Sequence, residues 1–446
     1  MVDVWRGRPR PRTASIIRPQ RVERPEVAFD MPRSHHVRQG QRGKHGVKGI
    51  EHPAEGGRQQ GRRCPGVACF RSWIGPTAMR GTIVSAEPRW WCNDLQGSEN
   101  RMKRFPFAAP IENLLFGLLV LGLTVSATSR AQGPPLWHDP SNHKVQFVTV
   151  EDGVQLEVLD WGGSGRPVVL LAGLGFTAHV FDGFAEKLTD SYHVYGITRR
   201  GYGASSRPAS GYTGQRRAED DLRVFDALKL VAPVVVGHSV AGDELSQLGI
   251  HHHERVGGLV YLDALHDGAD DWTDYDALCS KLPDAMQRPP TPSPSDLKSF
   301  PAYQDWRLRT QGVRIPESEF RDDFVENPDG SVGGPKTPGY VPDAIMRGGS
   351  KHDLSAIRSP VLAFVAYDEP PQEQIRKNHV ADPAERTIVE AVYGTFIGMA
   401  RIWIDSINRA AGGARVVELW GADHFVFLSN EADVLRELRA FLATLK

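Results

Sequence analysis

The chain has 446 residues and a formal net charge of −1, and this near-neutral total conceals two unequal parts. Residues 1–101 hold nineteen Lys and Arg against nine Asp and Glu, whereas the remainder carries a net charge of −11. The acidic balance of the larger part argues against a nucleic-acid partner, because such proteins need a basic surface.

Residues 1–101 are rich in Arg, Gly, Pro and Gln and show neither helical nor strand periodicity. Such a segment buries too little apolar surface to offset the entropy of ordering it. It reads as a basic nucleic-acid-binding arm, as a disordered extension, or as upstream sequence translated from a start site placed too early. We favour the last interpretation, in which this segment is not part of the genuine protein.

Residues 102–131 have the three parts of a secretory signal peptide. Two basic residues precede an apolar run from Leu114 to Val125, and small residues follow before Gln132. The run of about 12 residues is too short to span a bilayer comfortably. A membrane anchor or a buried helix is the alternative. We expect Met102 to be the true start, the product to be secreted or periplasmic, and no stable membrane insertion after cleavage.

Residues 132–446 predict one α/β domain, with an insertion at about 267–352 that is rich in proline and aromatic residues. The segment begins with a hairpin pattern around Asp152-Gly153. Apolar runs then alternate with helical patterns such as 216–230 and 431–445, which is typical of a parallel sheet covered by helices on both faces. The runs expected to form strands are 167–173, 193–198, 231–239, 256–264, 359–368 and 414–421.

One of these strands ends in "VVVGHSVAG", with Ser239 at the junction to the next helix. A serine on a sharp strand-to-helix turn exposes its hydroxyl, and the turn accepts only small residues nearby. Gly237 and Ala241 stand two residues before and two after Ser239, and Gly242 follows. Ser239 is therefore the candidate nucleophile, although an ordinary helix-capping serine fits the same pattern.

A serine nucleophile needs a base, and the base needs a carboxylate that orients it. His424 follows the last strand and is the candidate base. Asp368 closes the strand at 359–368 and is the preferred acid, and Asp263, at the end of the preceding strand, is the alternative. The backbone N–H groups of Leu174 and Val240 are the expected oxyanion donors.

These motifs in this order resemble the α/β-hydrolase family across roughly 145–446. The resemblance rests on strand–"AGLG", strand–"TRRGYGASSRP", strand–"GHSVAG", strand–"YLDA", the insertion, strand–"YD" and strand–"GADHF". It is closest to esterases and iminopeptidase-like members with a cap after the sixth strand. It implies a mostly parallel eight-stranded sheet with nucleophile Ser239, acid Asp368 and base His424. Ala172 stands where the family usually has a histidine. The long separation of Asp368 from His424 keeps Asp263 as an alternative.

The expected activity is hydrolysis of carboxylic esters by a secreted serine hydrolase, with a small-molecule ester or acyl substrate. A peptidase or iminopeptidase-like amidase and an acyltransferase would use the same triad. A non-catalytic ligand receptor is a weaker alternative. So is an NADP-binding oxidoreductase, in which "GLGFTA" and Arg199-Arg200 would hold the nucleotide.

We expect no cofactor and no metal. Consecutive histidines such as His251, His252 and His253 point in different directions on a helix. Aromatic residues are expected to line an apolar substrate pocket, as core packing would equally explain. The sequence does not predict an oligomeric state. The aromatic candidates are Phe176, Phe181, Trp272, Tyr275, Phe300, Tyr303 and Trp306.

Overall fold

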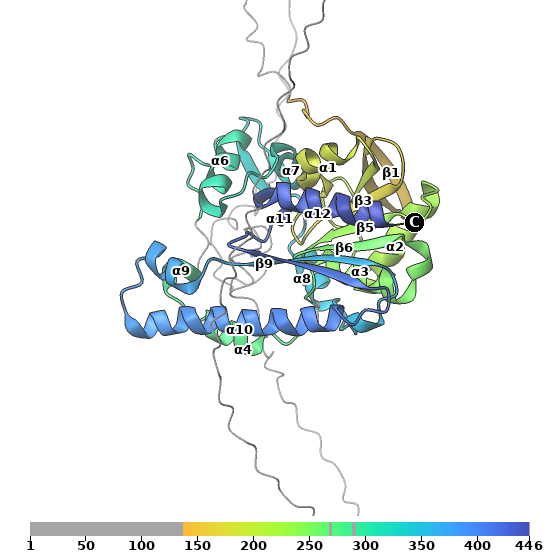
Figure 1. The fold of residues 1–446 in the computed structure, drawn as a ribbon. Coiled ribbons are helices and arrows are strands. Elements are labelled where there is room, and N and C mark those ends of the chain that lie inside the picture. The colour runs from red at the N-terminus through yellow and green to blue at the C-terminus, as the bar shows by residue number, and fades with distance from the viewer. Residues whose placement is uncertain (1–136, 267–269, 288–290, 446) are drawn as a thin grey trace, which may run out of the picture. The chain divides into compact units, whose positions relative to one another are not determined.

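The computed structural model describes residues 137–266, 270–287 and 291–445. The two segments predicted to be extraneous sequence and signal peptide, 1–101 and 102–131, lie outside the described residues. The described part contains an eight-stranded sheet flanked by helices on both faces, and a separate two-stranded sheet (Figure 1).

The large sheet has the strand order β1-β2-β4-β3-β5-β6-β9-β10. β1, β2 and β4 pair antiparallel, and every other neighbouring pair is parallel. The predicted mostly parallel eight-stranded sheet is thereby confirmed. The strands are β1 (Lys144–Glu151), β2 (Val154–Gly162), β3 (Pro167–Leu171), β4 (His193–Thr198), β5 (Val234–His238), β6 (Gly258–Leu262), β9 (Val361–Tyr367) and β10 (Ala414–Trp420).

The local sequence explains these strands. The turn between β1 and β2 falls at Asp152-Gly153, where Gly153 has φ +72°, a conformation that glycine adopts without strain. The six predicted apolar runs all form strands, and the central strands β3, β5 and β6 are Val- and Leu-rich and buried on both faces. The hairpin adds β1 and β2 at one edge of the sheet, where β1 is the outermost strand.

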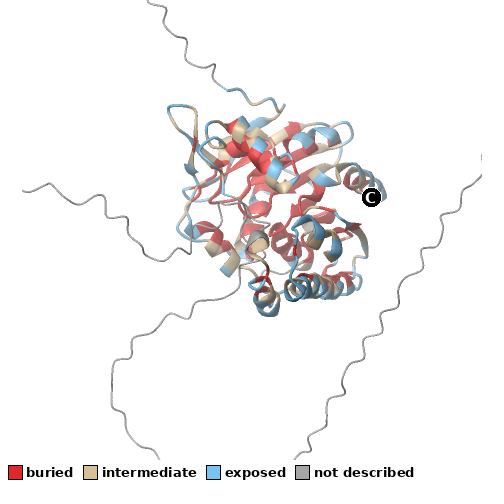
Figure 2. Ribbon diagram, turned by 90° about the vertical axis from the view of Figure 1, so that its left-hand side faces the viewer, coloured by how far each residue is buried: buried red, intermediate tan, exposed pale blue. Residues whose placement is uncertain are grey.

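Alternate residues of each strand enter one of two cores. In β3, Val168 and Leu170 pack towards α1 and α12, while Val169 and Leu171 pack towards α2, α3 and α10. Figure 2 shows the central strands buried, whereas the edge strands β1 and β10 carry exposed residues. The helices of eight residues or more are α2 (Gly214–Ala227), α3 (Ala241–His251), α6 (Phe300–Gln311), α8 (Tyr340–Arg347), α10 (Pro383–Ile407) and α12 (Glu431–Thr444).

The stretch between β6 and β9 contains five helices and the two-stranded sheet of β7 (Phe324–Glu326) and β8 (Val332–Pro335). Its parts pack in different places: α7 contacts η3, the 3₁₀ turn Ala178–Phe181, whereas α4 contacts α10. The shorter helices of the chain are α1 (Asp182–Ala185), α4 (Thr273–Cys279), α5 (Asp284–Gln287), α7 (Glu317–Asp323), α9 (Pro371–Lys377) and α11 (Val426–Ser429).

Helix α10 connects β9 to β10 and is 25 residues long. It is the one helix in the described ranges whose length and hydropathy would suffice to cross a membrane, a property that the core helices of many proteins share. Trp403, Ile404 and Ile407 are buried in the core beneath the sheet, while Ile402 is 68% exposed.

Candidate active site

Ser239 lies in the turn between β5 and α3, as the motif predicts. Its φ of +55° is in the left-handed region, which non-glycine residues rarely adopt. A Cβ on Gly237 would lie 2.5 Å from Leu245 Cδ1, and one on Gly242 would lie 1.9 Å from the carbonyl oxygen of Ala264. The small residues are therefore needed because the turn brings α3 against the ends of two strands.

His424 and Asp263 form a close pair at the same edge of the sheet. His424 Nδ1 lies 2.6 Å from Asp263 Oδ2, and both side chains are largely buried. The other oxygen, Asp263 Oδ1, accepts a hydrogen bond of 2.9 Å from the N–H of Ala366. Because Asp263 Oδ2 accepts the proton on Nδ1, the lone pair of the ring belongs to His424 Nε2, as a general base requires.

In this geometry His424 pairs with Asp263, the alternative acid, and not with Asp368, the preferred one. Asp368 follows β9 at the expected edge and is exposed. After Asp368 the chain turns outward through Pro370 into α9. Asp263, the alternative acid, has φ +49°, so its backbone is also in the left-handed region, and its carboxylate reaches the imidazole.

His238 links the two halves of the site. Its ring centroid lies 4.6 Å from that of His424, and its Nε2 donates to the backbone carbonyl of His424 at 3.1 Å. Burial, and then the neighbouring His424, lower the pKa of His238 well below its ordinary value, so His238 is neutral. The N–H of Ser239 donates to the carbonyl of Leu262, the residue before Asp263.

The loop after β3 lies directly against the serine turn. A Cβ on Gly173 would lie 2.7 Å from His238 Nδ1 and 3.2 Å from Ser239 Cβ, so only glycine permits this approach. Within the described residues, neither of the predicted oxyanion donors, the N–H groups of Leu174 and Val240, donates a hydrogen bond to the protein. Both amides are therefore available to a ligand.

Two buried arginines that the sequence left open have structural partners. Arg199 donates to the carbonyl oxygens of Ala172 and Gly173, at 2.6 and 2.9 Å, and pairs with Glu244. Arg200 forms two hydrogen bonds with Asp220. Arg199 thus holds the loop after β3 in place, and both guanidinium groups are buried and paired within the protein.

Asp243 and Glu244, at the start of α3, belong to the same network of buried charged side chains as Arg199. Asp243 Oδ2 accepts a 2.7 Å bond from Arg217, and Asp243 Oδ1 lies 2.6 Å from His352 Nε2. The partners of Asp243, Arg217 and His352, lie far from it along the chain. This network fixes the first turn of α3, on which Ser239 depends.

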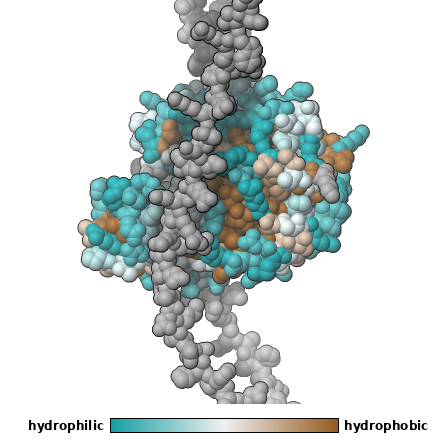
Figure 3. Space-filling view, in the orientation of Figure 1, coloured by the Kyte–Doolittle hydropathy of each residue, from teal (hydrophilic) through white to brown (hydrophobic). Residues whose placement is uncertain are grey.

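A small apolar pocket opens beside the His424–Asp263 pair. Of the predicted aromatic residues, Trp272 and Tyr275 line it, whereas Phe176, Phe181, Phe300, Tyr303 and Trp306 belong to a core cluster. Ser239 is outside the lining. On the face drawn in Figure 3 the surface is largely hydrophilic, with apolar residues gathered towards the centre. The described residues that line it are Asp263, Leu265, His266, Trp272, Tyr275, Val365, Phe396, Trp403 and His424.

Comparisons with known proteins agree with this fold. A protein of Caulobacter segnis whose provisional name is carbamate hydrolase RutD is 38% identical over 112 residues, 24% of this chain and 42% of that protein. A non-heme chloroperoxidase of Streptomyces lividans is 34% identical over 102 residues, 22% of this chain and 37% of that protein. The matched segments thus span about two-fifths of these relatives.

A solved structure, the esterase RhEst1 from Rhodococcus sp. ECU1013, is 19% identical and superposes with a TM-score of 0.45, covering 68% of this chain and 99% of that one. Residues 168–437, more than half of the chain, match the family described as the alpha/beta hydrolase family. With its eight-stranded sheet and its serine turn, the chain belongs to the alpha/beta hydrolase family.

Proposed function

We propose that the protein is a serine hydrolase that cleaves carboxylic esters through an acyl-enzyme, with nucleophile Ser239, base His424 and acid Asp263. The observation that carries the proposal is the 2.6 Å pair of His424 Nδ1 and Asp263 Oδ2 beside a left-handed serine turn. A strained backbone at both Ser239 and Asp263 is typical of residues whose positions are dictated by function.

In the proposed reaction, Ser239 Oγ attacks the acyl carbonyl and His424 Nε2 takes its proton. Asp263 stabilises the imidazolium that forms, and the N–H groups of Leu174 and Val240 hold the oxyanion. The intermediate then releases the alcohol, protonated by His424, and leaves Ser239 acylated. Water attacks the acyl-enzyme with His424 again as base, and the carboxylic acid leaves.

The pocket lining supports an apolar acyl or alcohol group of modest size. Trp272, Tyr275, Phe396 and Trp403 surround one side of the His424–Asp263 pair. An amidase, a carbamate hydrolase or an acyltransferase would use the same three residues, so the substrates tested include an amide and a carbamate. A receptor that binds ligand without turnover would hydrolyse none of these substrates.

The test is to compare the full-length protein with Ser239→Ala on p-nitrophenyl acetate, butyrate and decanoate, a phenyl carbamate and prolyl-p-nitroanilide. Ester turnover in the wild type should fall by at least about 10³-fold in Ser239→Ala, with an unchanged circular dichroism spectrum. The matched control is Ser246→Ala, since Ser246 lies on α3 and contacts Tyr261 instead of the site. Equal turnover by wild type and Ser239→Ala would reject the proposal.

We also propose that the protein is exported, on the basis of the signal-like sequence of residues 102–131. Expression of the full chain followed by fractionation and N-terminal sequencing tests this. Mature protein that begins at Gln132 outside the cytoplasm is expected. An uncleaved chain confined to the cytoplasm would contradict export without touching the catalytic proposal.

A further inference from the structure

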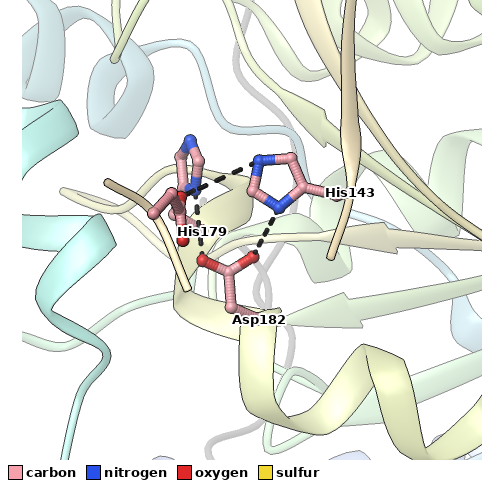
Figure 4. A group of neighbouring side chains, drawn as sticks. His143, His179 and Asp182 are labelled. Carbon is pink, nitrogen blue, oxygen red and sulfur yellow. Dashed lines mark hydrogen bonds and ion pairs between the residues drawn. The ribbon is translucent and has the colours of Figure 1, made fainter. Parts of the chain in front are cut away.

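Four side chains of types that can ligate a metal lie together near the start of the described domain. Asp139 and His143 lie just before β1, His179 lies in η3, and Asp182 begins α1. Figure 4 shows the two imidazole rings directed at separate oxygens of the Asp182 carboxylate. One donor atom from each of the four residues lies within 4.8 Å of all the others.

Three of the four separations between donor atoms approach those of a coordination shell, and the four together involve both oxygens of Asp182 and both ring nitrogens of His143. His179 Nδ1 lies 3.2 Å from Asp182 Oδ2 and 3.5 Å from Asp139 Oδ2, and His143 Nδ1 lies 3.4 Å from Asp182 Oδ1. In a tetrahedral site with bonds of about 2.05 Å, neighbouring donor atoms are about 3.3 Å apart. The longest of the four, 3.9 Å, joins His143 Nε2 to Asp139 Oδ2.

Burial and an unmet hydrogen bond point independently to a ligand. The His143 side chain is 4% exposed and that of Asp182 is 5% exposed. His143 Nδ1 is buried and has no hydrogen-bond partner, although it faces Asp182. A buried ring nitrogen without a partner is costly, and a bound cation would remove that cost.

A second layer of polar groups holds the cluster in place. Ser141 Oγ and Trp161 Nε1 donate to Asp182 Oδ1, and Ser318 Oγ donates to Asp182 Oδ2. A ring nitrogen of His179 also lies within 4.8 Å of carboxylate oxygens of Glu157 and Asp322. Carboxylates and hydroxyls around the ligands are the usual way in which proteins orient a metal's imidazole and carboxylate groups.

We propose that Asp139, His143, His179 and Asp182 bind one divalent transition-metal cation of the zinc type. Two imidazoles with two carboxylates suit zinc, whereas calcium and magnesium prefer oxygen ligands alone. The cation would join the segment before β1 to η3, which begins four residues after Leu174. Its role is therefore structural, since it braces the start of the domain against the loop that carries a proposed oxyanion donor.

The test is to strip the full-length protein with a chelator, remove the chelator and titrate it with Co²⁺ and then Zn²⁺. The expected result is one tightly bound cation, visible d–d absorption typical of tetrahedral Co²⁺ that Zn²⁺ quenches, and a higher melting temperature with Zn²⁺. A thiolate charge-transfer band would instead indicate a cysteine site and count against the proposal.

His143→Gln and His179→Gln should each weaken binding at least about 100-fold and abolish the rise in melting temperature. Two variants are used because one of them could fail to fold, which circular dichroism would reveal. The matched controls are His193→Gln, whose ring pairs with Asp160 outside the cluster, and His252→Gln in the surface histidine run. Absence of binding, or binding that His143→Gln and His179→Gln leave unchanged, would overturn the assignment.

Discussion

The carboxylate of Asp263 has both oxygens engaged, one with the imidazole of His424 and one with the N–H of Ala366 on the neighbouring strand. A carboxylate held at two points cannot rotate away from the ring, so it fixes both the tautomer and the orientation of His424. Asp368 is one strand further along and exposed. The two aspartates therefore differ in whether they can orient the base.

Substituting each aspartate by asparagine separates their roles. In Asp263→Asn the amide favours the wrong tautomer of His424, and kcat for ester hydrolysis should fall by about 10⁴-fold. In Asp368→Asn, the matched control, kcat should change less than about threefold because no hydrogen bond to the ring is lost. Steady-state kinetics on p-nitrophenyl butyrate measures both. A larger loss of kcat in Asp368→Asn than in Asp263→Asn would indicate that Asp368 is the acid.

The sequence could place Ser239 and His424 because each is read from its own neighbourhood: a strand, a turn and a helix. It could not choose between Asp263 and Asp368, since both close apolar strands and the choice depends on a left-handed backbone at Asp263. The role of Arg199 could not be predicted either, because its acceptors are the backbone carbonyls of Ala172 and Gly173. A hydrogen bond to a backbone carbonyl does not depend on the type of the accepting residue, so the sequence does not indicate it.

Among the elements, α3 has the tightest approach to the sheet. A Cβ on Gly242, in the first turn of α3, would meet the backbone carbonyl of Ala264, which follows Asp263. A backbone carbonyl cannot move aside by changing rotamer, as a flexible side chain can. The glycine therefore sets how close the serine turn lies to the end of β6, and so to the acid.

Gly242→Ala should destabilise the protein by about 3 kcal/mol and lower ester turnover, because the Ala264 carbonyl must move. The control is Gly398→Ala in α10, where a Cβ meets nothing within 4 Å. That change should stabilise by up to about 1 kcal/mol through helix propensity. Urea denaturation gives both values. Equal effects would mean that the contact at α3 relaxes without cost.

Strands were easier to predict than the elements between them. The runs that form β3, β5 and β6 are Val- and Leu-rich and end at glycine or polar residues, so their type and order follow from local sequence. The stretch 267–352 gave only proline and aromatic content. Its packing, with α7 on η3 and α4 on α10, is set by partners distant in the chain.

At the scale of the whole molecule, stability should depend on pH through Asp323 at the end of α7. Burial, followed by the nearby Asp322, raises the pKa of Asp323 to about 7, and its Oδ1 has no hydrogen-bond partner. The unfolded chain releases this proton near pH 4, whereas the folded protein keeps it to about pH 7. The protonated Asp323 carboxyl therefore makes its full contribution to the free energy of unfolding below about pH 4, and this contribution is lost as the pH rises towards 7.

Between pH 5 and pH 8 the wild type should lose up to about 3 kcal/mol of unfolding free energy relative to Asp323→Asn. Asparagine keeps the shape of the side chain but cannot ionise, so other titrating groups cancel in the comparison. Chemical denaturation of both proteins at the two pH values measures the difference. Parallel pH profiles would show that the carboxylate is solvated in the folded protein.

Because His424 pairs with Asp263, the proposed catalytic residues and the helix that lines the pocket come from different segments of the chain. Asp263 follows β6, so the proposed nucleophile and the proposed acid lie at the ends of adjacent strands before the long insertion begins. The connection between β9 and β10 then supplies no residue to the proposed proton relay. Its length is therefore not constrained by the proposed catalytic chemistry. Helix α10 occupies that connection and contributes Phe396 and Trp403 to the pocket wall. We expect an exchange of the α9–α10 segment to change the substrate range of the proposed hydrolase and to leave its proposed triad in place.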